Sequence, residues 1–205
     1  MKIVTISREF GSGGRELGKR LAQQLGFAYC DREIVAAVAR KSELSEEYAA
    51  RAGEQAPGFP LTFRRTLSLP AGQQPGMKVL LAQREVLKEL AARGEDCVIV
   101  GRGADVVLAE YRPLNLFVYA APEAKLRRCR ERAPEGEQLA GRELSRRIRQ
   151  VDAGRAQYYR LISGRTWGQK EHYHLCVNTT GLNLKSVAPW AAGFVQSWFR
   201  EEGSL

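Results

Sequence analysis

The stretch that decides the fold is VTISREFGSGGRELGKRLAQQLG, residues 4–26. Its apolar start is typical of a buried strand, and Gly14–Leu25 places leucines at the spacing of one helix face. Between the two patterns, Gly11, Gly13 and Gly14 would let backbone amides approach an anion, and the following helix N-terminus favours negative charge. The stretch predicts either a phosphate-binding turn between a strand and a helix, or a tight turn without a ligand.

Neither common glycine-loop pattern fits this turn. The dinucleotide pattern GxGxxG fails because Glu16 occupies the position of its last glycine. The pattern GxxxxGK(S/T) fails because Gly14 follows Gly13 at the position where the lysine belongs.

The composition indicates one globular domain of ordinary type. The chain has 205 residues, of which 44% are apolar and 27% are charged. Apolar runs such as VIV at 98–100 and LFVYAA at 116–121 are too short to span a bilayer, and the start shows no signal peptide pattern. Four widely spaced cysteines without a CxxC pair fit a reducing compartment, so we expect a cytoplasmic protein.

The net charge of +9 favours anionic partners. Nucleic acid and nucleotides both qualify, and the charge alone does not choose between them. No nucleic-acid-binding motif is recognisable, so we expect small nucleotides rather than specific binding of nucleic acid.

Strand and helix patterns alternate along the whole chain. We expect strands at 2–6, 27–31, 97–101, 114–120 and 174–179, and helices at 14–25, 32–40 (continuing at 45–51), 78–93, 123–132, 141–159 and 186–201. The proline- and glycine-rich residues 52–76 predict a loop or mobile segment. This order predicts a parallel sheet with helices on both faces, and such sheets bind ligands at the carboxyl ends of their strands.

Residues 4–31 resemble the cytidylate kinases, a family of P-loop nucleoside monophosphate kinases. In that family the segment reads like I-x-I-D-G-P-x-G-A-G-K-G-T, followed by a helix and L-x-x-x-x-x-D. Gly11 and Gly13 match its second and third glycines, and Asp31 matches the aspartate that ends the second strand. The string SREFGSGGRE resembles a bacterial subgroup of cytidylate-kinase-like proteins.

The departures from the family pattern are concentrated in the loop. Ser7, Arg8 and Glu9 replace Asp-Gly-Pro, and Gly14 replaces the lysine. Glu16 replaces the threonine that normally helps to hold magnesium.

Two arginines flank the position of the missing lysine. Arg15 is adjacent to it, and Arg8 lies at the other end of the loop. We expect one of them to supply the lost positive charge, as a planar fork rather than a point charge.

Three later segments continue the resemblance in the same order. In VIVGRGADVVL (98–108), Arg102 matches an arginine that helps to bind the monophosphate, with Asp105 near the position of the family's next aspartate. In LNLFVYAAPEAKLRRCRER (114–132), Arg128 belongs to a run that leads into the arginine-rich lid. In IRQVDAGRAQYYR (148–160), Asp152 and Arg155 resemble a substrate-binding Asp-x-x-Arg segment. The alternatives are a surface arginine, a solvated charge run and a local helical ion pair.

The resemblance implies a fold and a domain organisation. The fold would be the three-layer α/β fold of P-loop kinases, with a parallel sheet and helices on both faces. Residues 1–205 would form a single domain, with a monophosphate-binding insertion around 36–80 and a helical lid around 127–155.

The resemblance also implies transfer of the ATP γ-phosphoryl group to CMP, dCMP or a related monophosphate. Arg8, Arg15 and Arg128 would be catalytic, and Mg²⁺ would be bound with the help of Glu16. Asp31, Arg102, Asp152 and Arg155 would bind the acceptor. The ATP phosphates would lie on Gly11, Ser12, Gly13, Gly14, Arg15 and Glu16.

Three other functions stay open, and so does the oligomeric state. They are a nucleotide-binding regulatory protein of the same fold without catalysis, a kinase for another small acceptor, and a nucleic-acid-binding module.

Overall fold

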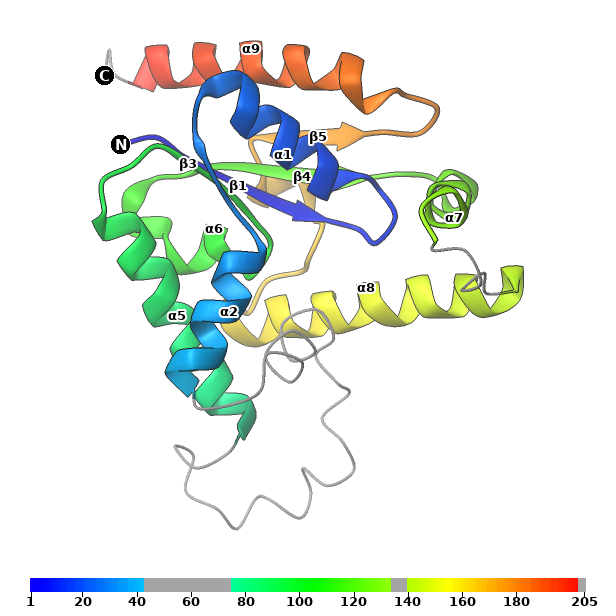
Figure 1. Ribbon diagram of the computed structural model, residues 1–205, viewed down its shortest axis with the longest axis horizontal. Coiled ribbons are helices and arrows are strands. Elements are labelled where there is room, and N and C mark those ends of the chain that lie inside the picture. Colours follow the sequence, from blue (N-terminus) through cyan, green and yellow to red (C-terminus); the bar gives the residue numbers. More distant parts are fainter. Residues whose placement is uncertain (43–74, 134–139, 203–205) are drawn as a thin grey trace.

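The computed structural model describes residues 1–42, 75–133 and 140–202. Within them, five strands form one sheet in the order β2-β3-β1-β4-β5, and every neighbouring pair is parallel (Figure 1). The strands are β1 (Ile3–Arg8), β2 (Ala28–Cys30), β3 (Cys97–Val100), β4 (Leu114–Tyr119) and β5 (Leu175–Asn178). The predicted parallel sheet is therefore confirmed.

Helices cover both faces of this sheet. The longer helices are α1 (Gly14–Leu25), α2 (Arg32–Ser42), α5 (Pro75–Ala92), α7 (Pro122–Glu131), α8 (Gly141–Ser163) and α9 (Leu184–Glu202). Shorter turns are α6 (Ala104–Val107), η2 (Ala109–Tyr111) and η3 (Lys170–His172). Helices α1 and α9 lie on one side, and α2, α5, α6 and α8 lie on the other (Figure 1). The three-layer α/β fold is thus confirmed.

Several boundaries differ from the predicted ones. Strand β1 continues to Arg8, and α8 continues past residue 159 to Ser163, after which Gly164 ends the helix in a left-handed conformation. Helix α6 was not predicted, because the glycines before it indicate a loop. The predicted helix at 45–51 and most of the predicted insertion and loop fall on residues 43–74, outside the described residues.

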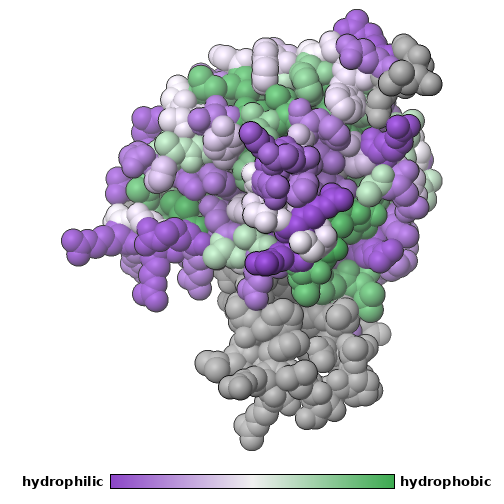
Figure 2. Space-filling model, turned by 180° about the vertical axis from the view of Figure 1, so that it is seen from behind, coloured by the Kyte–Doolittle hydropathy of each residue, from purple (hydrophilic) through white to green (hydrophobic). Residues whose placement is uncertain are grey.

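The core follows the alternation of side chains along the buried strands. On β1, Val4 and Ile6 pack into the cluster under α1 and α9, whereas Ile3 packs into the cluster under α2 and α5. Fully burying an aliphatic side chain contributes about 1.5–3 kcal/mol, so these two clusters hold the sheet between its helices. Seen from behind, hydrophilic residues cover much of the described surface (Figure 2).

Among the described residues, we find no helix with both the length and the apolar character needed to cross a membrane.

Helix α1 lies close to the sheet because of one glycine. A Cβ atom at Gly18 would lie 2.7 Å from Val100 Cγ2 and 3.1 Å from Ile6 Cδ1. Gly193 in α9 offers the opposite case, since a Cβ atom there would meet nothing within 4 Å.

These two glycines give a matched pair of substitutions. Gly18→Ala should lower the free energy of unfolding by about 1 kcal/mol or more, because overpacking outweighs the gain in helix propensity. Gly193→Ala should raise it by roughly 0.5–1 kcal/mol, because only the gain in propensity remains. Urea unfolding of both variants measures the difference, and equal effects would show that α1 is not tightly packed.

Candidate functional site

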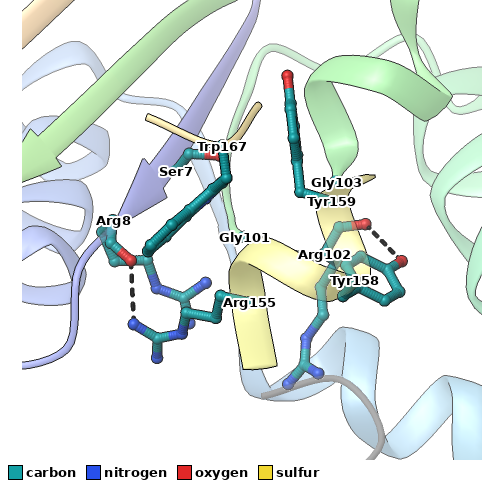
Figure 3. Close-up of a pocket in the computed structure, with 9 residues that line it drawn as sticks. All are labelled: Ser7, Arg8, Gly101, Arg102, Gly103, Arg155, Tyr158, Tyr159 and Trp167. Atoms are coloured by element: carbon teal, nitrogen blue, oxygen red, sulfur yellow. Dashed lines mark hydrogen bonds between the residues drawn. The ribbon is translucent and has the colours of Figure 1, made fainter. Parts of the chain in front are cut away.

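The candidate site lies at the carboxyl end of the sheet, where β1 and β3 end beside α8. A pocket there has a volume of about 310 Å³, counting space open to solvent (Figure 3). It is lined by Ser7, Arg8, Gly101, Arg102, Gly103, Arg155, Tyr158, Tyr159 and Trp167. The structure therefore brings together the predicted site residues Arg8, Arg102 and Arg155.

The three arginines of this pocket are mostly buried. Arg8 and Arg102 are 8% and 6% exposed, and the side chain of Arg155 is 10% exposed. Arg155 donates a hydrogen bond from Nη1 to the carbonyl oxygen of Arg8 at 2.9 Å, and in Figure 3 the side chains of Arg8 and Arg155 run toward each other, with that of Arg102 beside Tyr158. Planar guanidinium groups gathered in this way suit a phosphate or carboxylate ligand.

Arg102 has an unusual backbone. Its φ is 65°, between Gly101 at 79° and Gly103 at 61°. A left-handed conformation costs a residue with a side chain roughly 1–2 kcal/mol. Two contacts hold the peptide, since the carbonyl oxygen of Arg102 accepts bonds from Tyr158 Oη at 3.2 Å and Gln83 Nε2 at 3.4 Å. Strain retained at a strand end is typical of functional sites.

Hydrogen bonds within the glycine loop between β1 and α1 fix its shape. Gly11 and Gly13 have φ values of 75° and 84°, which favour glycine. The fully buried Ser12 donates its hydroxyl to the carbonyl oxygen of Glu9 at 2.8 Å and accepts the amide of Gly14 at 3.3 Å. Ser12, predicted to bind phosphate, therefore uses its hydroxyl to shape the loop.

Arg128 holds the same loop from α7. Its guanidinium donates to the carbonyl oxygens of Gly11 at 3.3 Å, Ser12 at 3.0 Å and Thr179 at 2.8 Å. The buried Thr179 adds a bond from Oγ1 to the carbonyl oxygen of Ser12 at 2.6 Å. Burial, and then the nearby Arg127, lower the pKa of Arg128. In this arrangement Arg128 positions the loop backbone.

Asp152 of α8 and Lys125 of α7 also contact the loop. Asp152 Oδ1 accepts the amide of Phe10 at 2.7 Å, and Lys125 Nζ lies 3.0 Å from Glu9 Oε2 and 3.5 Å from Asp152 Oδ2. Burial raises the pKa of Asp152, and the Phe10 amide, Arg155 and Lys125 oppose this rise. Asp152, predicted to bind the acceptor, thus contacts the loop backbone and lies 3.7 Å from Arg155 Nη1.

Arg15 and Asp31 lie next to each other, and neither of them lines the pocket. They form an ion pair in which Arg15 is about half exposed and Asp31 is buried. Tyr29 Oη donates to Asp31 Oδ2 at 3.3 Å, and burial raises the pKa of Tyr29 to about 12. Arg15 is therefore engaged at the end of β2.

The predicted magnesium ligand Glu16 does not fit that role in this arrangement. Its Oε1 accepts a bond from Arg20 at 2.8 Å, and its Oε2 pairs with Arg132. Within the part of the chain that the structure describes, no group of three or more His, Cys, Asp or Glu residues is placed to hold a metal. The loop and the arginines fit phosphate groups, whereas Glu16 would first have to leave two arginines.

Sequence reasoning missed several residues of the site. Tyr158 and Tyr159 follow Arg155 at helical spacing, so their position on the same face could have been predicted. Trp167 reaches the pocket from the segment after α8, where it packs edge-on against Phe117 with ring centroids 5.3 Å apart. No sequence signal pointed to Trp167.

The strand order and the glycine loop after β1 together define the three-layer α/β fold of P-loop kinases. An uncharacterized protein from Eubacterium ventriosum has a similar structure, with a TM-score of 0.70 and 20% identity over 96% of this chain and 99% of that one. A shikimate kinase from Bacteroides thetaiotaomicron aligns with a TM-score of 0.51 and 18% identity over 100% and 99% of the two chains. At such identities the likeness concerns the fold.

The chain belongs to the cytidylate kinase-like family, whose model matches residues 3–181. A cytidylate kinase from Azorhizobium caulinodans is 30% identical over 141 residues, which make up 62% of this chain and 66% of that protein. The predicted membership in this family is confirmed.

Asp105 does not line the pocket. It is buried and accepts a hydrogen bond from Tyr159 Oη at 2.8 Å. Burial raises its pKa, which the bond from Tyr159 partly offsets. The folded protein therefore binds a proton at Asp105 more tightly than the unfolded chain does.

This raised pKa predicts a pH effect on stability. The contribution of Asp105 is most favourable in acid and declines as the pH rises from about 4 through the raised pKa. Asp105→Asn should flatten that decline, because the amide does not ionise. Urea unfolding between about pH 4 and 7 measures the slopes, and parallel curves for the two proteins would contradict the prediction.

Proposed function

We propose that the chain is an ATP-dependent phosphotransferase that moves the γ-phosphoryl group to CMP, dCMP or a related nucleoside monophosphate. One observation carries the proposal: a pocket with three mostly buried arginines lies beside a glycine loop at the carboxyl end of the sheet. The family and the name of the Azorhizobium relative support this substrate class. A cytoplasmic location remains a prediction.

The proposed roles divide between the loop and the pocket. The ATP phosphates would lie on the amides of the loop from Gly11 to Glu16 and at the N-terminus of α1, which favours anions. Arg102 and Arg155 would bind the acceptor phosphate. Asp31, which is also predicted to bind the acceptor, would have to do so from its ion pair with Arg15. Phosphoryl transfer requires positioning and charge neutralisation above all, and rigid guanidinium forks supply both.

The helices would contribute in two further ways. Arg128 and Asp152 would keep the loop in shape through the backbone contacts described above. The predicted lid, which includes parts of α7 and α8, would close over the substrates and exclude water. Magnesium bound to ATP would supply further neutralisation of phosphate charge.

A second candidate is a nucleotide-binding protein of the same fold without catalysis. It is favoured by the engagement of Glu16 with Arg20 and Arg132, together with the absence of a lysine at position 14. This candidate predicts binding of ATP or CMP without turnover.

An acceptor panel separates the two candidates. The purified protein is incubated with Mg-ATP and, in turn, CMP, dCMP, UMP, AMP and GMP, and ADP and the new diphosphate are quantified. We expect acceptor-dependent diphosphate, highest with CMP or dCMP. ATP binding without any diphosphate would instead support the second candidate.

A substitution in α8 tests the acceptor site. Arg155→Gln should raise the KM for the acceptor at least about tenfold, because a charge-assisted contact with phosphate is lost. Arg160→Gln is the matched control on the exposed side of the same helix and should leave the KM unchanged. Thermal unfolding of both variants checks that the fold is intact. An unchanged KM in folded Arg155→Gln would remove Arg155 from the acceptor site.

A further inference from the structure

A side chain at position 14 would collide with the side chain of Arg8. A Cβ atom at position 14 would lie 2.6 Å from Arg8 Cβ, closer than such atoms approach in real structures, and 3.1 Å from Arg8 Cγ. Val118 Cβ, at 3.1 Å, closes the other side. A side chain at position 14 would therefore collide with the side chain of Arg8 and would also press on Val118.

A second glycine gives space to the far end of Arg8. A Cβ atom at Gly101 would lie 1.7 Å from Arg8 Nη1 and 2.8 Å from Arg8 Cζ. The arginine side chain thus begins against Gly14 and ends at Gly101, in the pocket drawn in Figure 3. Gly14 leaves space for the start of this side chain, whereas Gly101 has a left-handed backbone that favours glycine by itself and lies against the guanidinium.

The residues at positions 8 and 14 are also exchanged relative to the cytidylate kinase pattern. In the cytidylate kinase pattern quoted above, glycine occupies the position of Arg8 and lysine occupies the position of Gly14. This chain has the reverse arrangement, with the cation at the strand end and the glycine at the start of α1. Because the two positions are in steric contact, the two changes form a single exchange.

We propose that Arg8 is the phosphate-binding cation of this loop, and that it replaces the lysine by a reciprocal exchange with Gly14. The inference rests on the proposed function, because it assumes that a polyphosphate lies on the loop. It selects Arg8 over Arg15, because Arg8 lines the pocket together with Arg102 and Arg155 whereas Arg15 does not. The guanidinium of Arg8 shares the pocket with Arg102 and Arg155, so it would lie between donor and acceptor, on the phosphoryl group in transit.

The contacts of Arg8 suit this role. Its backbone carbonyl accepts a bond from Arg155 at 2.9 Å, which fixes the strand end that presents the side chain. An arginine whose side chain is already packed against its neighbours loses little conformational freedom when it binds an anion. Its fork can contact two phosphate oxygens, whereas a lysine contacts them as a point charge.

A double-mutant cycle tests the exchange. Isothermal titration calorimetry measures the affinity for Mg-ATP and for adenosine in the unaltered protein, Arg8→Gln, Gly14→Lys and the double variant Arg8→Gly/Gly14→Lys. Arg93→Gln, an exposed arginine that follows α5, is the charge-matched control. Thermal unfolding is recorded for every variant.

The expected results differ for each variant. Arg8→Gln should weaken ATP binding at least about tenfold, because a charge-assisted contact is lost, and leave adenosine binding unchanged. Gly14→Lys alone should lower the unfolding temperature because of the clash with Arg8. The double variant should recover the ATP affinity to within about threefold of the unaltered protein, a non-additive result expected for residues in contact. It should also recover much of the unfolding temperature lost in Gly14→Lys, because only the closer contact with Val118 Cβ at 3.1 Å remains.

The outcomes distinguish this inference from the proposed function. ATP binding that depends on Arg8, without transfer to any monophosphate, supports the exchange and rejects the kinase activity. Transfer that survives Arg8→Gln but is lost in Arg15→Gln overturns the exchange and leaves the kinase activity standing. Failure of the double variant to recover ATP affinity while folded also overturns the exchange, and failure of the unaltered protein to bind ATP overturns both.

Discussion

The concentration of like charge at one edge of the sheet is the constraint on which the site depends. Arg8, Arg102 and Arg155 line one pocket, and burial of a charge is unfavourable unless polar partners compensate for it. Part of the compensation here is neutral, as in the bond from Arg155 to the carbonyl oxygen of Arg8. Asp152 adds a negative charge 3.7 Å from Arg155 Nη1, and an anionic ligand would compensate the arginines further. The apolar clusters on both sides of the sheet provide the stability that this arrangement requires.

The glycine loop depends on helices that lie far from it in the sequence. Arg128 of α7 binds its carbonyl groups, and Asp152 of α8 binds the amide of Phe10. Lys125 of α7 pairs with Glu9 in the loop and lies 3.5 Å from Asp152 in α8, so it connects the loop with both helices. A movement of α7 or α8 would therefore act directly on the loop, which gives the predicted lid a physical connection to the proposed phosphate-binding loop.

Much of the fold was predictable because its signals are local. The runs at 3–6, 97–100 and 114–119 are apolar on both faces, as buried parallel strands require. Arg102 was predictable in the site because it follows such a strand, and Arg155 because of its family motif. The backbone roles of Arg128 and Asp152 were not, because they depend on how α7 and α8 lie against the loop. Likewise, Arg8 and Arg15 flank the loop equally in sequence, and only the tertiary contacts of Gly14 and Gly101 separate them.

The steric contact between positions 8 and 14 also has an evolutionary consequence. Two routes, each of two successive substitutions, connect the loop of this chain with a loop that has glycine at position 8 and lysine at position 14. One route passes through a loop with both arginine and lysine, in which the two side chains clash. The other passes through a loop with glycine at both positions, in which neither position carries a cation. If Arg8 has the proposed role, both intermediates would be impaired, and natural selection would rarely reverse the exchange once it had occurred. A lineage that carries Arg8 is therefore expected to keep Gly14, and the two residues should be inherited as a unit.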